Sequence, residues 1–546
     1  MTDYIPFKDT GYFSEFITDY LSEKEELRCL YHRFPTPSAF LAQLKEKQAH
    51  YSQEHRDILF QSLEKQYRMF AISEKTHTNI QFIKEKNTFT VTTGHQLSLF
   101  TGPLYFIYKI VSTIVCCQHL RRLYPDYHFV PVYWMATEDH DFEEINHLTF
   151  RGQKVVWLSD QKGMVGEFST KELAPIAHLL EVTLGKGETA SQLANLFKRA
   201  YIEHSSLADA TRFLVNELFA PYGLVIIDGN DVALKELLVP YFKQELIENL
   251  AQKEVEKTLK YIKSINKSYP EQVHPREINI FYVKGNLRER IVKENGEYRV
   301  LNTNIKFSEE EIINELTQNP TYFSPNVILR PLYQEIILPN LAYIGGGGEI
   351  AYWLELKQMF QAYQVPFPML MLRNSVLLLN DKQQKKLQKL QLSYQDIFLK
   401  NAILENEITR KFSEIPIDFS SQRAILEKQF QELYQLASQT DASFRGAVKA
   451  QEVKQLKGLD MLEKRLLKAQ KKKYKEQLER VLSLRVELFP KESLQERVDN
   501  FSEYMIDTRG QLIDMLVKNL NPFDFRFVIL SYESASSQGA CIEYFV

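Results

Sequence analysis

Cysteine is scarce in this chain, with four residues among 546. Cys29 and Cys541 are isolated, whereas Cys116 and Cys117 are adjacent within an apolar stretch that is predicted to be helical. None of them forms a CxxC pair, so the sequence contains neither a disulfide framework nor the spacing of a zinc ribbon. This use of cysteine is typical of a reducing compartment, and we expect a cytoplasmic protein.

The sequence also lacks an excess of charge of one sign and a long hydrophobic run. Its 67 Lys and Arg against 70 Asp and Glu leave a net charge of −3, which disfavours a protein dominated by nucleic-acid binding. The most apolar run, residues 104–117, contains Lys109 and is shorter than the roughly 20 residues that cross a membrane. The N-terminus has no basic and apolar segments of a secretory signal. We therefore expect a soluble protein with neither a nucleic-acid nor a membrane partner.

Strands and helices alternate over the first two thirds of the chain. β-Branched residues at 88–92 and an apolar run at 129–135 predict two strands, and a long helix from Pro103 to about Leu123 connects them. A strand, a helix and a second strand form a βαβ unit, which requires a parallel sheet. Further buried strands are expected at 223–228, 342–344 and 369–372. The predicted fold class is α/β.

The composition changes near residue 376. The predicted core, residues 1–375, starts with a helical segment up to about residue 85 and carries insertions near 147–205 and 250–325. The second insertion includes a small β patch with a hairpin turn at Asn295-Gly296. Residues 376–490 have apolar side chains at helical spacing, which predicts two long helices in an antiparallel coiled-coil arm. Residues 491–546 are expected to pack back on the core.

The arm is unevenly charged, since residues 441–490 hold 13 basic and 7 acidic residues. A solvated basic face is the favoured interpretation. Contact with a phosphate or a nucleotide is the alternative.

The first candidate site follows the first predicted strand at Gly94, His95 and Gln96 and continues to Thr101 and Gly102. Glycine lets the backbone approach a ligand, and the start of the next helix offers N–H groups to a phosphate or carboxylate. An ordinary β-to-α turn explains the segment equally well, because it is neither a GxGxxG nor a Walker A sequence.

The second candidate site is a run of ionisable residues directly after the second predicted strand, Glu138, Asp139, His140 and Asp141. Open α/β sheets bind ligands at this edge. Carboxylates beside an imidazole suit acid–base chemistry, amine binding or a metal, although the spacing matches no known metal site. Asp141 is also placed to cap the next helix, with Glu144 as its capping-box partner.

The third candidate site combines Arg330 with the glycine run 345–348 and the helix that begins at Glu349. The guanidinium fork binds carboxylates and phosphates with two hydrogen bonds, and consecutive glycines before a helix can form an anion nest. The alternative is a loop with positive φ followed by core aromatic residues at Tyr352 and Trp353. Arg373, after the last predicted strand, is expected to line the same crevice.

Three stretches together carry a resemblance to a known family: TGHQLSLFTGPLYFIYKI, PVYWMATEDHDFEEIN and RPLYQEIILPNLAYIGGGGEIAYWLELKQMF. They resemble the bacillithiol biosynthesis cysteine-adding enzymes, the BshC family, and the likeness extends over essentially the whole chain. It implies a Rossmann-like core similar to nucleotidyltransferases and class I aminoacyl-tRNA synthetases, and a coiled-coil domain that makes a homodimer. The implied activity is a ligase that adds cysteine to glucosaminyl-malate, the last step to the low-molecular-weight thiol bacillithiol.

The resemblance also implies roles for individual residues. It implies catalytic roles for Glu138, Asp139, His140 and Arg330. ATP is the expected co-substrate, with contacts from Gly94, His95, Gln96, Thr101, Gly102, Lys109, Gly346, Gly348 and Arg373. The small-molecule substrates are expected to contact Asp141, Asn146, Gln334, Glu335, Glu349, Tyr352 and Trp353. No metal is predicted.

This chain departs from the commoner family pattern at two of these places. Gly94-His95-Gln96 stands where Gly-Gln-Gln is expected, so His95 is assigned to binding rather than to catalysis, and four glycines stand where Gly-Pro-Gly is expected. Two other functions stay open: an enzyme of the same fold that acts on another small substrate, and a coiled-coil scaffold that senses a nucleotide. A crevice with this many charged residues favours an enzyme.

Overall fold

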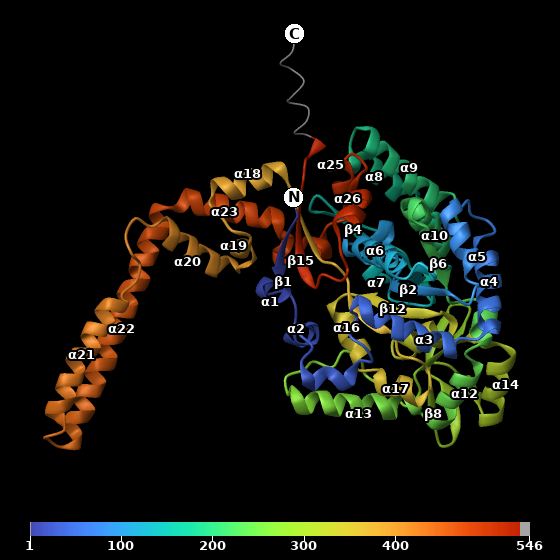
Figure 1. Cartoon of the computed structure of the whole chain (residues 1–546), viewed down its shortest axis with the longest axis horizontal. Helices are drawn as coiled ribbons and strands as arrows, with labels where there is room; N and C mark the ends of the chain where they lie inside the picture. Colours follow the sequence, from blue (N-terminus) through green and yellow to red (C-terminus); the bar gives the residue numbers. More distant parts are fainter. Residues whose placement is uncertain (1, 536–546) are drawn as a thin grey trace, which may run out of the picture. The chain divides into compact units, whose positions relative to one another are not determined.

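A parallel sheet forms the centre of the molecule in the computed structural model, which describes residues 2–535 (Figure 1). Its strand order is β13-β12-β2-β3-β6, and all four pairings are parallel. The strands are β2 (Thr88–His95), β3 (His128–Met135), β6 (Val225–Asp228), β12 (Asn340–Gly345) and β13 (Met369–Leu372). The predicted α/β class with a parallel sheet is confirmed.

The central strands are buried on both faces. β2 and β13 are buried almost throughout. The helix α6 (Tyr105–Leu123) links β2 to β3 and packs against these two strands. Cys116 and Cys117 lie in α6 and belong to the core between this helix and the sheet, with Phe89, Val91 and Phe129. Both thiols are buried, so the two cysteines pack as apolar core residues.

Two insertions interrupt the sheet. The first contains a hairpin of β4 (His147–Phe150) and β5 (Gln153–Val156), followed by α8 (Ala174–Leu184) and α9 (Glu188–Ile202). The second contains an antiparallel sheet of order β10-β9-β8-β7-β11, with Asn295-Gly296 at the turn between β8 and β9 as predicted. Its strands are β7 (Ile280–Lys284), β8 (Leu287–Glu294), β9 (Glu297–Val300), β10 (Lys306–Phe307) and β11 (Phe323–Pro325).

A strand at the start of the described residues and one near their end pair in a further sheet. β1 (Thr2–Pro6) pairs antiparallel with β15 (Arg526–Tyr532), which pairs parallel with β14 (Val376–Asn380). The prediction that residues 1–85 are helical is therefore wrong at its start. This strand depends on a partner more than 500 residues away, which no local pattern can indicate.

Helices cover the sheets and connect the strands. In the N-terminal part these are α1 (Phe7–Thr10), α2 (Glu15–Leu21), α3 (Phe40–His50), α4 (Gln53–Tyr67), α5 (Glu74–Phe82) and α7 (Phe142–Ile145). Further along come α10 (Leu207–Phe219), α11 (Val232–Glu236), α12 (Val239–Glu248), α13 (Leu250–Ile265), α14 (Glu309–Gln318), α15 (Leu329–Ile337), α16 (Gly347–Leu354) and α17 (Lys357–Ala362). The C-terminal segment adds α24 (Gln495–Val498), α25 (Phe501–Asp507) and α26 (Leu512–Asn519).

The chain divides into two compact units. Tyr12–Asp381, the N-terminal strand and the segment from Ser493 form the first unit, and Lys382–Glu492 with residues 9–11 form the second. The second unit consists of helices: α18 (Asp381–Lys389), α19 (Tyr394–Phe398), α20 (Asn401–Phe412), α21 (Ser420–Ala437), α22 (Ala442–Lys473) and α23 (Lys475–Leu488).

The predicted antiparallel pair of long helices is α21 and α22, which lie side by side (Figure 1). Phe430, Ala437 and Val448 are buried between them. Most of the Lys and Arg side chains of α22 are exposed, as a solvated basic face requires. Among the helices of residues 2–535, none is both long and apolar enough to cross a membrane.

Candidate functional site

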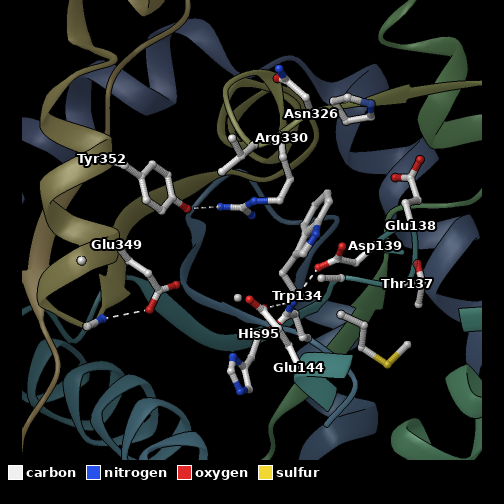
Figure 2. A pocket seen from close by; sticks show the side chains of 18 of the residues that line it. His95, Trp134, Thr137, Glu138, Asp139, Glu144, Asn326, Arg330, Glu349 and Tyr352 are labelled. Carbon is white, nitrogen blue, oxygen red and sulfur yellow. Dashed lines mark hydrogen bonds between the residues drawn. The ribbon is translucent and has the colours of Figure 1, made fainter. Parts of the chain in front are cut away.

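A cavity of about 830 Å³ opens at the carboxyl ends of the main strands (Figure 2). The chain runs from β2 outward to β3 and β6 and then returns to β12 on the other side of β2. Open α/β sheets bind ligands where the strand order reverses in this way. Gly94 at the end of β2 and Gly346 just after β12 both line the cavity, as do residues that follow β3.

The end of β2 is joined to α16 by a buried ion pair. Lys109 Nζ lies 2.6 Å from Glu349 Oε2 and donates a hydrogen bond to the carbonyl oxygen of Gly94. Glu349 also accepts hydrogen bonds from the Tyr343 hydroxyl and from the N–H of Gly346. Burial alone would raise the pKa of Glu349, but the charge of Lys109 and these hydrogen bonds lower it. The lysine charge is therefore balanced within the protein.

His95 packs beside this ion pair. Its ring lies against Tyr105 with centroids 5.3 Å apart, and its Nε2 is buried without a hydrogen-bond partner among the described residues. Burial and, after it, the charge of Lys109 lower the pKa of His95 to about 3. The imidazole is therefore neutral at physiological pH.

The end of β3 carries two carboxylates that are fixed in different ways. Glu138 forms an ion pair with the buried Lys235 of α11, whose ammonium also donates to the carbonyl oxygen of Phe323. Beside it, the Thr137 hydroxyl donates to Asp228 at the end of β6. Side chains of neighbouring elements thus hold Glu138 at the cavity wall.

Asp139 is held by hydrogen bonds alone. Its Oδ2 accepts from Gln96 Nε2 at 2.8 Å, and its Oδ1 accepts from the N–H groups of His140 and Asp141. Burial alone would raise the pKa of this carboxyl. The hydrogen bonds from His140, Gln96 and Asp141 outweigh burial and hold the pKa well below its usual range. Asp139 is therefore ionised at neutral pH.

His140 contacts both an arginine and a carboxylate. Arg288 Nη1 lies 2.9 Å from His140 Nδ1, and the same ring nitrogen lies 3.6 Å from Asp139 Oδ1. His140 therefore connects Arg288 of the second insertion to the carboxylate at the end of β3.

Arg330 lies in α15, and its guanidinium reaches the end of β2, where a Cβ on Gly94 would lie 3.5 Å from Arg330 Nη1. Its Nη2 donates to the Tyr352 hydroxyl at 3.1 Å and its Nη1 to Gln334 Oε1 at 3.2 Å, and its guanidinium lies over the ring of Tyr343. Figure 2 shows Arg330 between Tyr352 and Glu349 on one side and Asp139 and Glu138 on the other. Among the described residues no carboxylate forms an ion pair with it.

A buried chain of hydrogen bonds supports Arg330 from behind. Gln334 Nε2 donates to Glu335 Oε1, and Glu335 Oε2 lies 3.2 Å from Lys47 Nζ in α3. Asn340 Nδ2 donates to the same carboxylate at 2.6 Å. Glu335 is fully enclosed, and burial raises its pKa. The buried pair of Lys47 and Glu335 is thus connected to Arg330 in the cavity by the hydrogen bonds of Gln334.

Comparison with known proteins decides the family. The model described as "Bacillithiol biosynthesis BshC, N-terminal Rossmann-like domain" matches residues 1–374, and the model of the BshC C-terminal coiled-coil domain matches residues 376–532. The chain belongs to the BshC family. This confirms the resemblance and the Rossmann-like fold that it implied.

Relatives match almost from end to end. Proteins of Flavobacterium johnsoniae and Flavobacterium psychrophilum are 53% and 54% identical, each over 97% of this chain and 99% of the relative. A Bacillus cereus relative is 29% identical over 93% of this chain and 96% of its own length. All three are named "Putative cysteine ligase BshC", which agrees with the predicted ligase class. A Campylobacter jejuni structure described as a putative arginyl tRNA synthetase aligns at 10% identity, with a TM-score of 0.20 that is too low to indicate a shared fold.

Many of the residues for which the BshC resemblance implied a role line this one cavity. They are Gly94, His95, Gln96, Lys109, Glu138, Asp139, His140, Arg330, Gly346, Gly348, Glu349, Tyr352 and Arg373. Two of these residues, Lys109 and Arg373, were expected to contact ATP, but each is already paired with a glutamate of the protein. Lys109 is neutralised by Glu349, and Arg373 makes a buried ion pair of 2.7 Å with Glu496 of α24, which leaves only its Nε unpartnered.

Thr101 and Gly102 lie away from the cavity, contrary to the BshC-based expectation of ATP contacts. Residues 100–102 all have positive φ, and a Cβ on Gly102 would meet the Cβ of Ser98 at 2.7 Å. Asn500 Nδ2 donates to the carbonyl oxygens of Phe100 and Gly102. The N–H of Leu104, just before α6, donates to the carbonyl oxygen of Asp499. This turn is buried and packs against the C-terminal segment, and the N–H groups of Phe100, Gly102 and Leu104 are all hydrogen-bonded within the protein.

Five expected substrate contacts fall outside the cavity, and four of them have structural roles. Gln334 and Glu335 belong to the chain behind Arg330, and Trp353 is buried and stacked on Tyr343 with centroids 4.5 Å apart. Asn146 hydrogen-bonds the ring of His147. They are neighbours of cavity residues in sequence, but helix and strand geometry turns them away.

Asp141 is exposed, does not line the cavity and makes no side-chain cap. The expected capping box with Glu144 is therefore wrong. Glu144 instead accepts a hydrogen bond from Gln96 at 2.9 Å and lines the cavity.

The glycine run does not form the expected nest. Gly345 ends β12, Gly346 caps α16, and Gly347 and Gly348 are in its first turn, all without positive φ. A Cβ on Gly345 would meet Tyr343 Cε1 at 2.9 Å, so close packing explains that glycine. Beside Gly348 there is open space.

Sequence reasoning missed an entire wall of the cavity. Arg276, Arg288 and Arg290 come from the second insertion, and Lys235 supports Glu138 from α11. The one sequence signal for this wall was the spacing of Arg288 and Arg290, two positions apart in the predicted β patch. Among residues 2–535, no group of three or more His, Cys, Asp or Glu side chains is placed to hold a metal ion.

Proposed function

We propose that this chain is a cysteine ligase that joins the carboxyl group of cysteine to the amine of glucosaminyl-malate in the cytoplasm, the last step of bacillithiol biosynthesis. Membership of the BshC family supports the class of reaction. The observation that carries the assignment is the pair Glu138 and Asp139 at the end of β3, with Asp139 ionised and facing an 830 Å³ cavity. Such a pair binds an ammonium group and accepts its proton.

The amine substrate binds at this pair. Asp139 attracts the ammonium, and the buried Lys235 keeps the Glu138 carboxylate in place beside it. In the reaction the amine nitrogen forms a bond to the carboxyl carbon of cysteine, and the bond from that carbon to one carboxyl oxygen breaks. That oxygen would leave bonded to the phosphorus group transferred to it from ATP, the proposed co-substrate. The proton that the nitrogen loses passes to the carboxylate pair. An amide is formed.

The carboxyl group of cysteine binds at Arg330. Its guanidinium is oriented by Tyr352 and Gln334 and has no carboxylate partner within residues 2–535. The Tyr352 hydroxyl accepts hydrogen bonds from Arg330 and from Trp353 Nε1, so its own proton is available for a ligand oxygen. A fixed guanidinium beside a hydroxyl donor suits a carboxylate whose oxygen becomes more negative during the reaction.

ATP is the proposed co-substrate, and the residues near β2 and α16 fit it. His95 Nε2 and Arg373 Nε are buried polar atoms without partners among the described residues, and both residues line the cavity. Gly348, at the start of α16, has no neighbour that would exclude a phosphate group. ATP supplies the activation of the carboxyl group. The protein's part is to hold phosphate oxygens at these groups.

The arm is the proposed site of homodimer formation. Leu436, Phe444 and Met461 on α21 and α22 are exposed by 58%, 47% and 58%, which is costly for a monomer in water. Light scattering should give twice the chain mass for the native protein and a lower mass for a Leu436→Lys, Met461→Lys variant. A native monomer contradicts the proposal.

The cellular thiol profile tests the function. A strain without this protein should accumulate glucosaminyl-malate and contain no bacillithiol. The native gene should restore the thiol, whereas an Asp139→Asn allele should not. An unchanged thiol profile in the deletion strain would refute the proposed reaction.

A further inference from the structure

We propose that Arg276, Arg288 and Arg290 form a subsite for the dicarboxylate group of the amine substrate, the malyl group of glucosaminyl-malate. We call these three residues the arginine wall. The proposal rests on the proposed function, and it assigns to this wall the choice between a malylated and an unmodified glucosamine. Nothing in the family match points to these residues.

The backbone places the three guanidinium groups on one side of the cavity. Arg288 and Arg290 are two residues apart in β8 and therefore share a face of the antiparallel sheet. Arg276 lies in the loop before β7, where its N–H and its carbonyl oxygen are both bonded to the side chain of Asn279. Asn279 is buried and bonded to Glu245, so the loop is anchored in the core.

Arg288 is the fixed member of the wall. Its guanidinium lies 3.9 Å from the ring centroid of Phe281, and its Nη1 donates to His140. Its Nε is buried and has no hydrogen-bond partner among the described residues. A guanidinium that is stacked, hydrogen-bonded on one side and left with a free buried donor is oriented for an anionic ligand.

The charges of the wall are not balanced within the protein. Over residues 2–535, none of the three arginines has a carboxylate within ion-pair distance, although Glu138 and Asp139 are near enough to Arg288 to act through space. Two cations of the opposite side, Lys109 and Arg373, contact glutamates instead. Arg276 and Arg290 are exposed, whereas Arg288 is partly buried and its Nε is a buried donor without a partner among the described residues. An anionic ligand with more than one negative oxygen is expected to contact Arg288 and the two exposed arginines beside it.

The position of the wall favours a dicarboxylate over the phosphates of a nucleotide. Arg288 is bonded to His140, next to the carboxylates that are proposed to bind the amine. In glucosaminyl-malate the amine and the malyl group are on adjacent ring carbons, so the malyl group must bind beside the amine. The unpartnered atoms proposed for phosphate, on His95 and Arg373, belong to the other side of the cavity, where β2 and α16 meet.

Calorimetry on the full-length protein tests the subsite. Wild-type protein should bind glucosaminyl-malate at least about tenfold more tightly than methyl glucosaminide, which has the same amine without the carboxylates. The Arg276→Gln, Arg290→Gln double variant should bind the two compounds with similar affinity. Arg299→Gln is the matched control, because Arg299 is in the same sheet, is ion-paired to Glu294 and does not line the cavity. It should keep the preference.

Kinetics separate this proposal from the proposed function. In the double variant the KM for glucosaminyl-malate should rise at least about tenfold, with the KM for cysteine unchanged. A double variant that still prefers the malyl compound overturns the arginine wall, even if the protein is a ligase. Loss of inorganic phosphate binding with an unchanged malyl preference also overturns it, in favour of a phosphate subsite. A protein that shows the preference but makes no amide refutes the ligase and leaves the subsite standing.

Discussion

The two sides of the cavity differ in how their charges are balanced. On the side of the main sheet, Lys109, Lys235 and Arg373 each contact a carboxylate of the protein, whereas Arg330, which is proposed to bind a ligand, is held by Tyr352 and Gln334. On the side of the second insertion, the arginine wall has no such partner among the described residues. The first arrangement holds backbone and side chains in position whether or not a ligand is bound. The second is complete only when an anion binds.

This difference separates residues that support the structure of the site from residues that are proposed to bind a ligand. Removing one partner of a buried ion pair destabilises the folded protein, because the other charge remains unpaired in the core. An unpaired surface cation can be removed with little effect on folding. Substitution of a paired residue should therefore mainly lower stability, whereas substitution in the arginine wall should mainly weaken ligand binding.

The largest effect is expected at the carboxylate pair. Asp139→Asn keeps the shape of the side chain but removes the charge that binds the amine and accepts its proton. We expect a loss of about 100- to 10,000-fold in kcat, as for other acid–base residues. Steady-state amide formation measures it. Asp141→Asn is the control, because Asp141 is exposed and outside the cavity, and an equal loss there would contradict the assignment.

The chain behind Arg330 should respond mainly in stability. Lys47→Met leaves Glu335 buried without its counter-charge and should lower the free energy of unfolding by about 3 to 5 kcal/mol. Urea denaturation measures the loss. Lys24→Met is matched in residue type, and the loss of its exposed pair with Asp19 should lower the free energy of unfolding far less than Lys47→Met does. Similar losses in the two variants would show that the Lys47 pair is not a buried structural element.

His95 should make stability depend on pH. Its pKa is lowered to about 3 in the folded protein, whereas in the unfolded chain a histidine has a pKa near 6.5. Below about pH 6.5 the unfolded state therefore binds the extra proton, and the native state is destabilised as the pH falls. One such group contributes about 1.4 kcal/mol between pH 7.5 and 5.5.

A His95→Gln variant should lack this contribution. The difference between wild type and variant in unfolding free energy, measured at the two pH values, isolates it from the other histidines. A difference that does not change with pH would mean that the folded imidazole titrates normally.

The smallest effect on stability is expected in the arginine wall. Arg290 is exposed and has no ion pair among residues 2–535, so Arg290→Gln should change the free energy of unfolding by less than about 0.5 kcal/mol. The same urea experiment as for Lys47 measures it. A loss comparable to that of Lys47→Met would show that the wall also builds the fold, and the contrast between the two sides would disappear.

Local patterns were sufficient to predict the main sheet and its connections. β-Branched and apolar runs marked β2 and β3, and the helix between them made the sheet parallel. The carboxylates after β3 were predicted to line the site because the carboxyl ends of parallel strands share one edge. These inferences need only neighbours within a few tens of residues.

The partners of those residues could not be predicted in the same way. Arg288 is 148 residues from His140, and Lys235 is 97 residues from Glu138. Gln334 and Glu335 were assigned to substrate because they follow Arg330, but the helix turns them into the core. Sequence proximity predicted which segment approaches the cavity, whereas packing decided which side chains face it.

The most direct test of the account is amide formation by the purified protein. Incubation with cysteine, glucosaminyl-malate and ATP should yield bacillithiol by mass spectrometry, the yield should require all three compounds, and Asp139→Asn should abolish most of it. Methyl glucosaminide in place of the malyl compound should give much less product. No bacillithiol from native protein, or equal yield from Asp139→Asn, would contradict the proposed reaction and its site.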